Sequence, residues 1–187
     1  MQRIVIIDNY DSFTYNLVHL VSPLVDQLDV MRNDEINHSL IIEAEHIILS
    51  PGPGLPSGSN ELLNVIAKYH RSHNVLGVCL GHQAIGNYFG SKLKNLSSVR
   101  HGLSSEIKIR NNDIIYRNLS KSFQIGHYHS WVIDQLPKEF ILTATDNDEQ
   151  IMSMRHQSLK IFGLQYHPES ILTQNGHELI KNWLDNS

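Results

Sequence analysis

The sequence predicts an α/β protein with a single domain, residues 1–187, built on an open, mainly parallel sheet with flanking helices and additional mixed or antiparallel strands. Three observations predict this class. Four short runs are almost continuous in isoleucine, leucine and valine, which is typical of parallel strands buried on both faces. Segments with helical periodicity lie between the first three of these runs. From residue 92 to 154 the pattern changes to short strand-like runs without helices between them.

The elements are predicted in chain order from these patterns. The parallel strands are expected at Ile4–Ile7, Ile47–Leu49, Val75–Val78 and Ile161–Leu164. A first helix is expected from Phe13 to Leu24, where apolar residues recur at three and four positions after a cap at Asp11 or Ser12. Further helices are expected at Glu61–Arg71, from Gln83 to Phe89 and at His177–Leu184. The added strands are expected at Ser105–Arg110, Phe123–Ile125, Phe140–Thr145 and Ile151–Met154.

Composition narrows the class of protein. The net charge is −4 and the chain has no basic block, so we expect no nucleic-acid partner. A single cysteine rules out an internal disulfide framework and favours a reducing compartment. The apolar run at the N-terminus is too short for a signal peptide, and no run approaches the length of a membrane span. These features predict a cytoplasmic protein that does not associate with a membrane.

Twelve histidines raise the question of a metal site. The pairs His70/His73 and His127/His129 could each place two rings on one face of an element. Zinc sites usually have three or four ligands in clusters, and no acidic residue or cysteine stands at ligand spacing beside either pair. We therefore expect no metal in this chain and expect these histidines to lie at the surface.

The single cysteine lies in the segment Gly77-Val78-Cys79-Leu80-Gly81-His82-Gln83, between an apolar strand and a predicted helix. A nucleophile between two glycines at a strand-to-helix turn is the pattern of a nucleophile elbow, here with cysteine in place of serine. The glycines suit a sharp turn, and the helix N-terminus behind the cysteine favours the thiolate. The segment therefore predicts Cys79 as a catalytic nucleophile.

Two other segments supply what such a nucleophile needs. His167-Pro168-Glu169 follows the last predicted strand and offers a general base, His167, with a carboxylate, Glu169, to orient it. The loop Pro51-Gly52-Pro53-Gly54 follows the second strand. Ligands in open α/β sheets bind at the carboxyl ends of the strands, so these three loops are expected to converge. The N–H groups of Gly52 and Leu80 are the expected donors to an oxyanion.

Together these motifs closely resemble the class I, or triad, glutamine amidotransferases over essentially the whole chain. The resemblance implies a flavodoxin-like α/β fold and hydrolysis of the glutamine side-chain amide through a thioester on Cys79. It implies no cofactor in this chain, with Mg²⁺ expected in a chorismate-binding partner that receives the ammonia. By position, it implies that L-glutamine contacts Gly52, Pro53, Gly54, Gln83, Ser130 and Trp131.

Two further segments, Asp8–Asn16 and His167–Thr173, resemble the chorismate-dependent branch of this family. That branch contains the small subunits of anthranilate synthase, which serves tryptophan synthesis, and of aminodeoxychorismate synthase, which serves folate synthesis. We favour the first, with the second, or a chain that serves both, as the alternative. A non-catalytic scaffold and a γ-glutamyl hydrolase are the remaining alternatives. The sequence departs from the family where it often has arginine, at His127, and where leucine is frequent, at Trp131.

Overall fold

The structure is a computed structural model that describes residues 2–185. Its strands are β1 Arg3–Asp8, β2 Gln27–Arg32, β3 His46–Leu49, β4 Asn74–Val78, β5 Leu93–Ile109, β6 Ser122–Ile133, β7 Phe140–Thr145, β8 Ile151–His156 and β9 Ile161–Leu164. Its α-helices are α1 Thr14–Val21, α2 His38–Glu43, α3 Leu62–Tyr69, α4 Leu80–Tyr88 and α5 Gly176–Leu184. Single tighter turns occur at η1 Ser22–Leu24, η2 Pro56–Gly58 and η3 Ile114–Tyr116.

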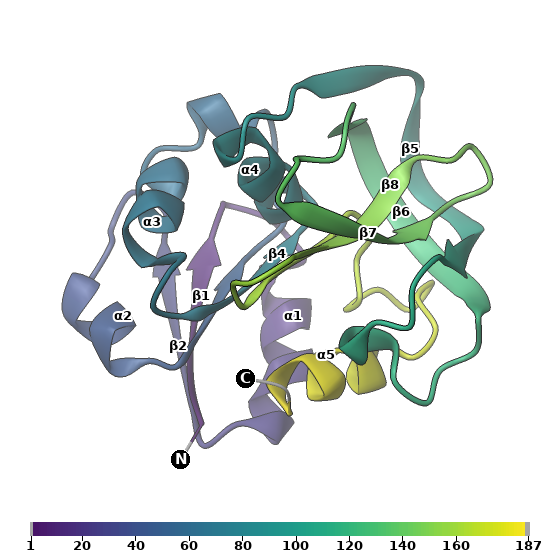
Figure 1. Cartoon of the computed structure of the whole chain (residues 1–187). Helices are drawn as coiled ribbons and strands as arrows, with labels where there is room; N and C mark the ends of the chain where they lie inside the picture. Colours follow the sequence, from purple (N-terminus) through teal and green to yellow (C-terminus); the bar gives the residue numbers. More distant parts are fainter. Residues whose placement is uncertain (1, 186–187) are drawn as a thin grey trace.

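Within the described residues the strands form one sheet of nine, in the order β2-β1-β3-β4-β9-β8-β7-β5-β6 (Figure 1). Neighbours from β2 to β9 pair in parallel, and the remaining pairs are antiparallel. All four predicted parallel strands are confirmed, and so is the addition of antiparallel strands in the second half of the chain. The fold is therefore a single-domain α/β sheet, as predicted.

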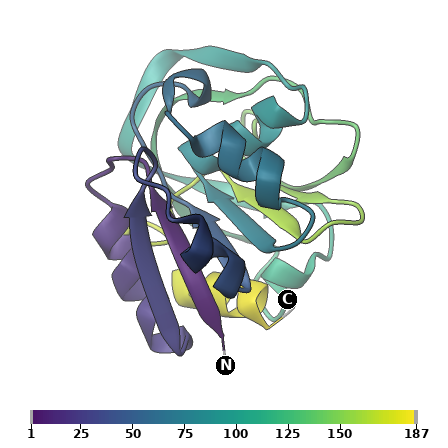
Figure 2. The same ribbon diagram turned by 90° about the vertical axis from the view of Figure 1, so that its left-hand side faces the viewer.

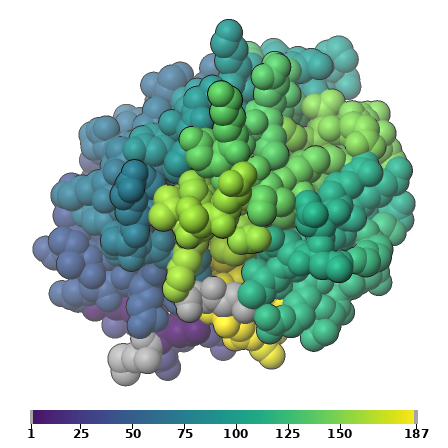
Figure 3. Space-filling model, in the orientation of Figure 1, coloured from purple at the N-terminus to yellow at the C-terminus, as the bar shows by residue number. Residues whose placement is uncertain are grey.

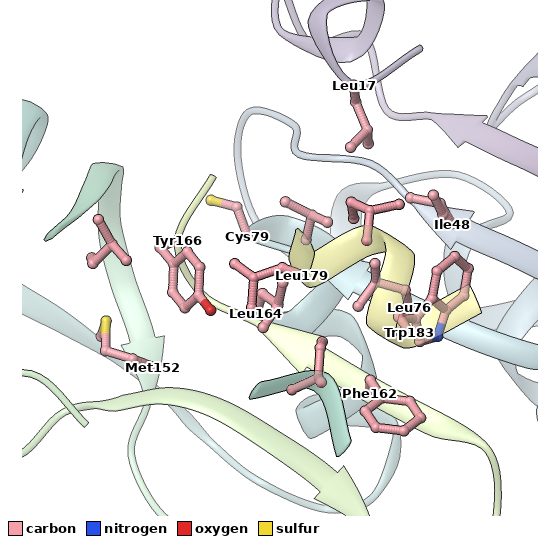
Figure 4. Packing of buried hydrophobic residues seen from close by; sticks show 14 of the residues in the cluster. Leu17, Ile48, Leu76, Cys79, Met152, Phe162, Leu164, Tyr166, Leu179 and Trp183 are labelled. Atoms are coloured by element: carbon pink, nitrogen blue, oxygen red, sulfur yellow. The ribbon is translucent and has the colours of Figure 1, made fainter. Parts of the chain in front are cut away.

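The helices cover both faces of the parallel half of the sheet (Figures 1 and 2). The buried side chains of α1 and α5 belong to one hydrophobic cluster, and those of α2, α3 and α4 belong to the other. Strand β1 supplies both clusters, because Ile4 and Ile6 point to the first while Val5 and Ile7 point to the second. Figure 4 shows the first cluster, which includes Cys79.

The structure differs from the predictions where the pattern was weak. Strand β2 was not predicted because it lies at the edge of the sheet, and only Met31 in it is buried. Helix α2 was not predicted either; it has six residues, capped by the Asn37 side chain. The ribbon of β5 and β6 is far longer than predicted, since most of β5 is exposed and its register shifts twice.

Several helix boundaries differ from the predicted ones by one to three residues, including the starts of α1 and α4. The first helix begins at Thr14, and its cap position is Phe13 rather than Asp11 or Ser12. The Asp11 carboxylate instead accepts a 2.7 Å hydrogen bond from the Phe13 N–H, which shapes the turn before the helix. Helix α4 begins at Leu80, directly after the cysteine and before the predicted start at Gln83. Among the described residues, no helix is long and apolar enough to cross a membrane.

Candidate active site

Cys79 lies on a strained turn between β4 and α4. Its backbone has a φ of +51°, a conformation that residues other than glycine rarely adopt. The turn depends on its two glycines: a β-carbon on Gly77 would lie 2.5 Å from the backbone of Gly81. A β-carbon on Gly81 would lie 2.2 Å from the Leu49 carbonyl oxygen. The predicted elbow is therefore present, and close backbone packing is the reason for the glycines.

The thiol of Cys79 is buried and held against the neighbouring strand. Only 5% of the residue is exposed, and its N–H donates a 2.8 Å hydrogen bond to the carbonyl of Leu164 at the end of β9. Its sulfur receives a hydrogen bond from the side-chain nitrogen of Gln165, at 3.7 Å. Because α4 starts at the next residue, the sulfur also lies at a helix N-terminus, where negative charge is favoured.

His167 and Glu169 form a buried pair beside this turn. The imidazole Nδ1 lies 2.7 Å from a carboxylate oxygen of Glu169, so the ring donates its Nδ1 proton to that oxygen. The rings of Phe13 and Tyr128 pack against the imidazole at centroid distances of 5.4 and 4.9 Å. Among the described residues, its Nε2 has no hydrogen-bond partner. The ring is therefore fixed on one side and leaves Nε2 available to a reacting group.

The pKa of His167 reports its neighbours. Burial lowers this pKa, but the charge of the nearby Cys79 and, after it, the hydrogen bond and charge of Glu169 raise it well above the usual value for histidine. The structure therefore brings the predicted nucleophile and base into direct electrostatic interaction. A positively charged imidazole beside a cysteine favours the thiolate, which is the reactive form of a cysteine nucleophile.

The two residues expected to donate to an oxyanion, Gly52 and Leu80, are neighbours in the fold. Leu80 is the first residue of α4, and a β-carbon on Gly52 would lie 2.6 Å from the Leu80 side chain. Neither backbone N–H donates a hydrogen bond to another group among the described residues. The loop that carries Gly52 is anchored by Asn9, whose side-chain nitrogen donates a 2.8 Å bond to the Ser50 carbonyl. Both amides are thus held in place and available to a substrate.

A cavity of about 220 Å³ opens at the thiol. Its wall consists of Gly52, Pro53, Gly54, Cys79, Gln83, Val99, His101, Tyr128, His129, Ser130 and Trp131. All six residues that the family resemblance assigned to glutamine are among them. Segments far apart in the chain, the loop after β3, helix α4 and the ribbon of β5 and β6, therefore meet around Cys79.

Sequence reasoning missed five residues of this site, among them Tyr128 and His129, which line the cavity. Val99 and His101 lie on the exposed ribbon, in a polar stretch without a local motif. Gln165 is fully buried and contacts the thiol, and it follows directly after β9. Its position at the carboxyl end of a predicted parallel strand was the available signal.

The prediction that the paired histidines lie at the surface is wrong for three of the four. His70, His127 and His129 are buried, and His73 is half-buried. His127 and His129 contact each other, with Nδ1 of the first 3.0 Å from Nε2 of the second. The prediction rested on the absence of further ligands beside each pair, and that absence carries no information on burial by other elements of the fold. Among the described residues, no group of three or more metal-ligating side chains is placed to hold a metal.

Comparisons with known proteins agree with this geometry. The sequence pattern of the family "Glutamine amidotransferase class-I" matches residues 5–187. Anthranilate synthase component 2 of Saccharolobus solfataricus is 40% identical over 193 aligned residues, covering 99% of each chain. Aminodeoxychorismate synthase component 2 of Escherichia coli is 40% identical over 185 aligned residues, covering 97% of this chain and 98% of that protein.

A crystal structure from Thermoplasma acidophilum, described as part of a GMP synthase, supports the fold alone. It is 24% identical, with a TM-score of 0.89, and the match covers 99% of this chain and 93% of the other. The family match and the two relatives span nearly all of the sequence, including the elbow and the histidine–glutamate pair. The protein belongs to the class-I glutamine amidotransferases.

Proposed function

We propose that this chain, as a single amidotransferase domain over residues 1–187, hydrolyses L-glutamine to glutamate and ammonia. We further propose that it delivers the ammonia to a chorismate-using synthase, as component II of anthranilate synthase. One observation carries the chemistry: Cys79 opens into a polar cavity, and His167, hydrogen-bonded to Glu169, interacts with its sulfur. The two relatives compared above carry the choice of pathway.

The proposed reaction has two steps, the formation of a thioester on Cys79 and its hydrolysis. The Cys79 thiolate attacks the side-chain carbonyl carbon of glutamine, and the resulting oxyanion accepts hydrogen bonds from the N–H groups of Gly52 and Leu80. The carbon–nitrogen bond then breaks as His167 gives its Nε2 proton to the leaving nitrogen, which departs as ammonia. Water, deprotonated by His167, hydrolyses the remaining thioester and releases glutamate. Glu169 holds the imidazole in the tautomer that both steps of the reaction need.

The cavity suits a small amino acid. It is small, about 220 Å³, and the family resemblance places the substrate against backbone groups of Ser130 and Trp131 as well as the loop from Gly52 to Gly54. A site that binds a zwitterion needs several oriented donors and acceptors, which backbone groups provide without added charge. We propose that Gln83, in the first turn of α4, contacts the substrate.

We propose that the synthase partner docks on the face around the cavity and the segment 8–16. Large apolar side chains are exposed there: Tyr10 at 47%, Tyr15 at 64% and Ile171, in the loop after His167, at 98%. Tyr128 is half-buried and packs on Phe13, so it supports the site from within. Covering this face would keep ammonia from escaping to solvent. The partner would hold the Mg²⁺, and the complex would work in the cytoplasm.

Aminodeoxychorismate synthesis is the second candidate for one specific reason. The relative named for that enzyme has the same 40% identity to this chain as the relative named for anthranilate synthase. A chain that serves both synthases fits the same observation.

The test is to capture the partner of this chain from its native extract and to assay conversion of chorismate with glutamine. Formation of anthranilate supports the proposed pathway, and formation of 4-amino-4-deoxychorismate supports the second candidate. Glutamine consumption that does not respond to any synthase would point to a free hydrolase. No release of glutamate from glutamine, alone or in the complex, would contradict the proposed function itself.

A further inference from the structure

Gln165 is the one buried amide side chain that contacts the sulfur of Cys79 among the residues that the structure describes. It is fully buried, and its nitrogen lies 3.7 Å from that sulfur. Strand β9 holds it there, because the Leu164 carbonyl just before it accepts the 2.8 Å hydrogen bond from the Cys79 N–H. His167 follows two residues later. One short segment therefore presents two polar side chains to the same thiol.

The orientation of the Gln165 amide follows from its partners. The Trp131 carbonyl oxygen can only accept, so the side-chain atom of Gln83 that lies 2.7 Å from it must be the nitrogen. The same nitrogen lies 3.2 Å from the Gln165 side chain, which must therefore present its oxygen. The remaining group of Gln165 is its NH₂, and this group faces the sulfur.

A second line of hydrogen bonds fixes the Trp131 carbonyl from the other side. That carbonyl also accepts a 3.1 Å bond from Nδ1 of His129, so the Nε2 of this ring is an acceptor for Nδ1 of His127 at 3.0 Å. The Nε2 of His127 in turn accepts a 2.6 Å bond from the Ser105 hydroxyl. The chain of bonds therefore runs in one direction from the ribbon to the carbonyl.

The imidazole rings of His127 and His129 both stay neutral at ordinary pH. Burial, followed by the charge of Arg100, lowers the pKa of His127 to about 4. Burial, followed by the charges of His127 and Arg100, lowers the pKa of His129 to about 3. A neutral imidazole has one donor and one acceptor, as each position in the chain requires. The neutral rings therefore keep the direction of these hydrogen bonds, which end at the Trp131 carbonyl that also accepts from Gln83.

We propose that Gln165 is a catalytic residue: its amide N–H donates to the Cys79 thiolate, while its oxygen fixes Gln83 against the wall of the cavity. A hydrogen bond to an ionised acceptor stabilises the charged form more than the neutral one. Gln165 thus stabilises the nucleophile in its reactive form. It also connects the sulfur to the Trp131 backbone that the substrate is expected to contact, so nucleophile and binding wall form one network.

The first test measures the thiolate directly. Cys79 is the only cysteine, so the rate of alkylation by iodoacetamide at pH 7 reports this thiol alone. In Gln165→Leu the rate should fall about tenfold, since a hydrogen bond to a charged group is lost. Gln165→Glu keeps an acceptor for Gln83 but places a carboxylate by the sulfur, and it should slow alkylation at least as much. An unchanged rate in both folded variants would overturn the proposal.

Tyr166→Phe is the matched control. Tyr166 is the next residue and is equally buried, but its hydroxyl bonds to that of Tyr116 and takes no part in the hydrogen bonds of Gln165 and Gln83. This variant should lose some thermal stability yet keep the alkylation rate within about twofold, because it leaves the contacts of the sulfur intact. If it slows alkylation as much as Gln165→Leu, the effect is one of packing and the proposal fails.

The second test measures glutamine turnover in the complex with the synthase, and here the inference rests on the proposed function. Gln165→Leu should lower kcat about 10- to 100-fold, with a smaller change in KM, because the thiolate acts in the chemical step. A rise in KM alone would show that Gln165 only positions Gln83. If the wild type consumes no glutamine, the proposed function fails, while alkylation still decides the part concerning Gln165.

Discussion

The parallel half of the sheet, strands β1 to β4 and β9, and the antiparallel half, β5 to β8, contribute different parts of one site. The parallel half carries the groups expected to react, Cys79 and His167, on short turns directly after buried strands. The antiparallel half contributes one wall of the cavity from a long ribbon whose register shifts twice. Both halves reach the face shown in Figure 3, where blue residues of the parallel half lie beside green residues of the antiparallel half.

The two halves differ in how tightly the backbone is packed at the site. The turns that hold the reacting groups have no room for an added β-carbon and leave the backbone no alternative position. In the ribbon most of β5 is exposed, whereas β6 is largely buried, and the Trp131 carbonyl of β6 accepts a hydrogen bond from Gln83 of α4. Changes in the parallel half are therefore expected to reduce kcat, and changes in the ribbon are expected to raise KM for glutamine.

The largest effect is expected from Cys79→Ser. A serine hydroxyl at this position lacks the reactive thiolate, so glutamine-dependent synthesis should fall by at least about 10⁴-fold. Synthesis from free ammonium by the partner should be unchanged, and it serves as the control because it bypasses the thioester. Glutamine use that persists in the serine variant would mean that Cys79 is not the nucleophile.

The next effect separates the two members of the buried pair. His167→Ala removes the group that transfers protons and should lower kcat about 10³-fold, whereas Glu169→Gln should lower it about 10²-fold. The difference follows from their contacts: Glu169 touches only the Nδ1 side of the ring. Steady-state kinetics of both variants in the complex check this. Equal losses would show that Glu169 does more than orient the ring.

Gly81→Ala tests the tightness of the parallel half. The new methyl group would lie 2.2 Å from the Leu49 carbonyl oxygen, which should destabilise the protein by about 1–3 kcal/mol. Gly58→Ala is the control, since a β-carbon there has nothing within 4 Å. Denaturant unfolding of both variants gives the comparison. If they are equally stable, the elbow is more adaptable than its packing indicates.

The His167 pKa offers a titration test of the same region. Cys79 is the main cause that raises this pKa, so Cys79→Ala should lower it, although Glu169 continues to raise it against the effect of burial. The titration of the His167 ring proton, followed by NMR in the wild type and the variant, measures the shift. A pKa that does not fall would show that the thiolate and the imidazolium do not interact.

The smallest effect is expected in the ribbon. His101 lines the cavity and its ring packs edge-on against Tyr128 at 5.3 Å, so His101→Ala should raise KM for glutamine about two- to tenfold with less change in kcat. Leu103→Ala, two residues along the same strand, is exposed and does not line the cavity, so it is the control. A loss mainly in kcat would remove the distinction between the two halves.

The sequence allowed prediction of the parallel half because its signals are local. The apolar strands, the elbow around Cys79 and the position of His167 after a strand all follow from short segments and one topological rule. The position of the six residues around the cavity came instead from the family resemblance, which local patterns could not supply.

The rest of the site depends on contacts between distant segments. His101 reaches the cavity only because the ribbon folds over it, and nothing near it in the sequence marks this. His127 and His129 were expected at the surface because burial by another element leaves no local pattern. The side-chain amide of Gln165 is oriented by a hydrogen bond from Gln83, which is 82 residues away in the chain. Such pairings require the tertiary structure.

The alternation of side chains along β1 limits how this protein can change in length. Because successive residues enter opposite hydrophobic clusters, deleting Val5 would bring Ile6 into its place and would exchange the clusters that the following residues of the strand enter. The same deletion would draw Asp8 back by about 3.3 Å and away from the turn that it caps. Insertions and deletions can therefore accumulate in the surface loops, while the central strands keep a fixed number of residues.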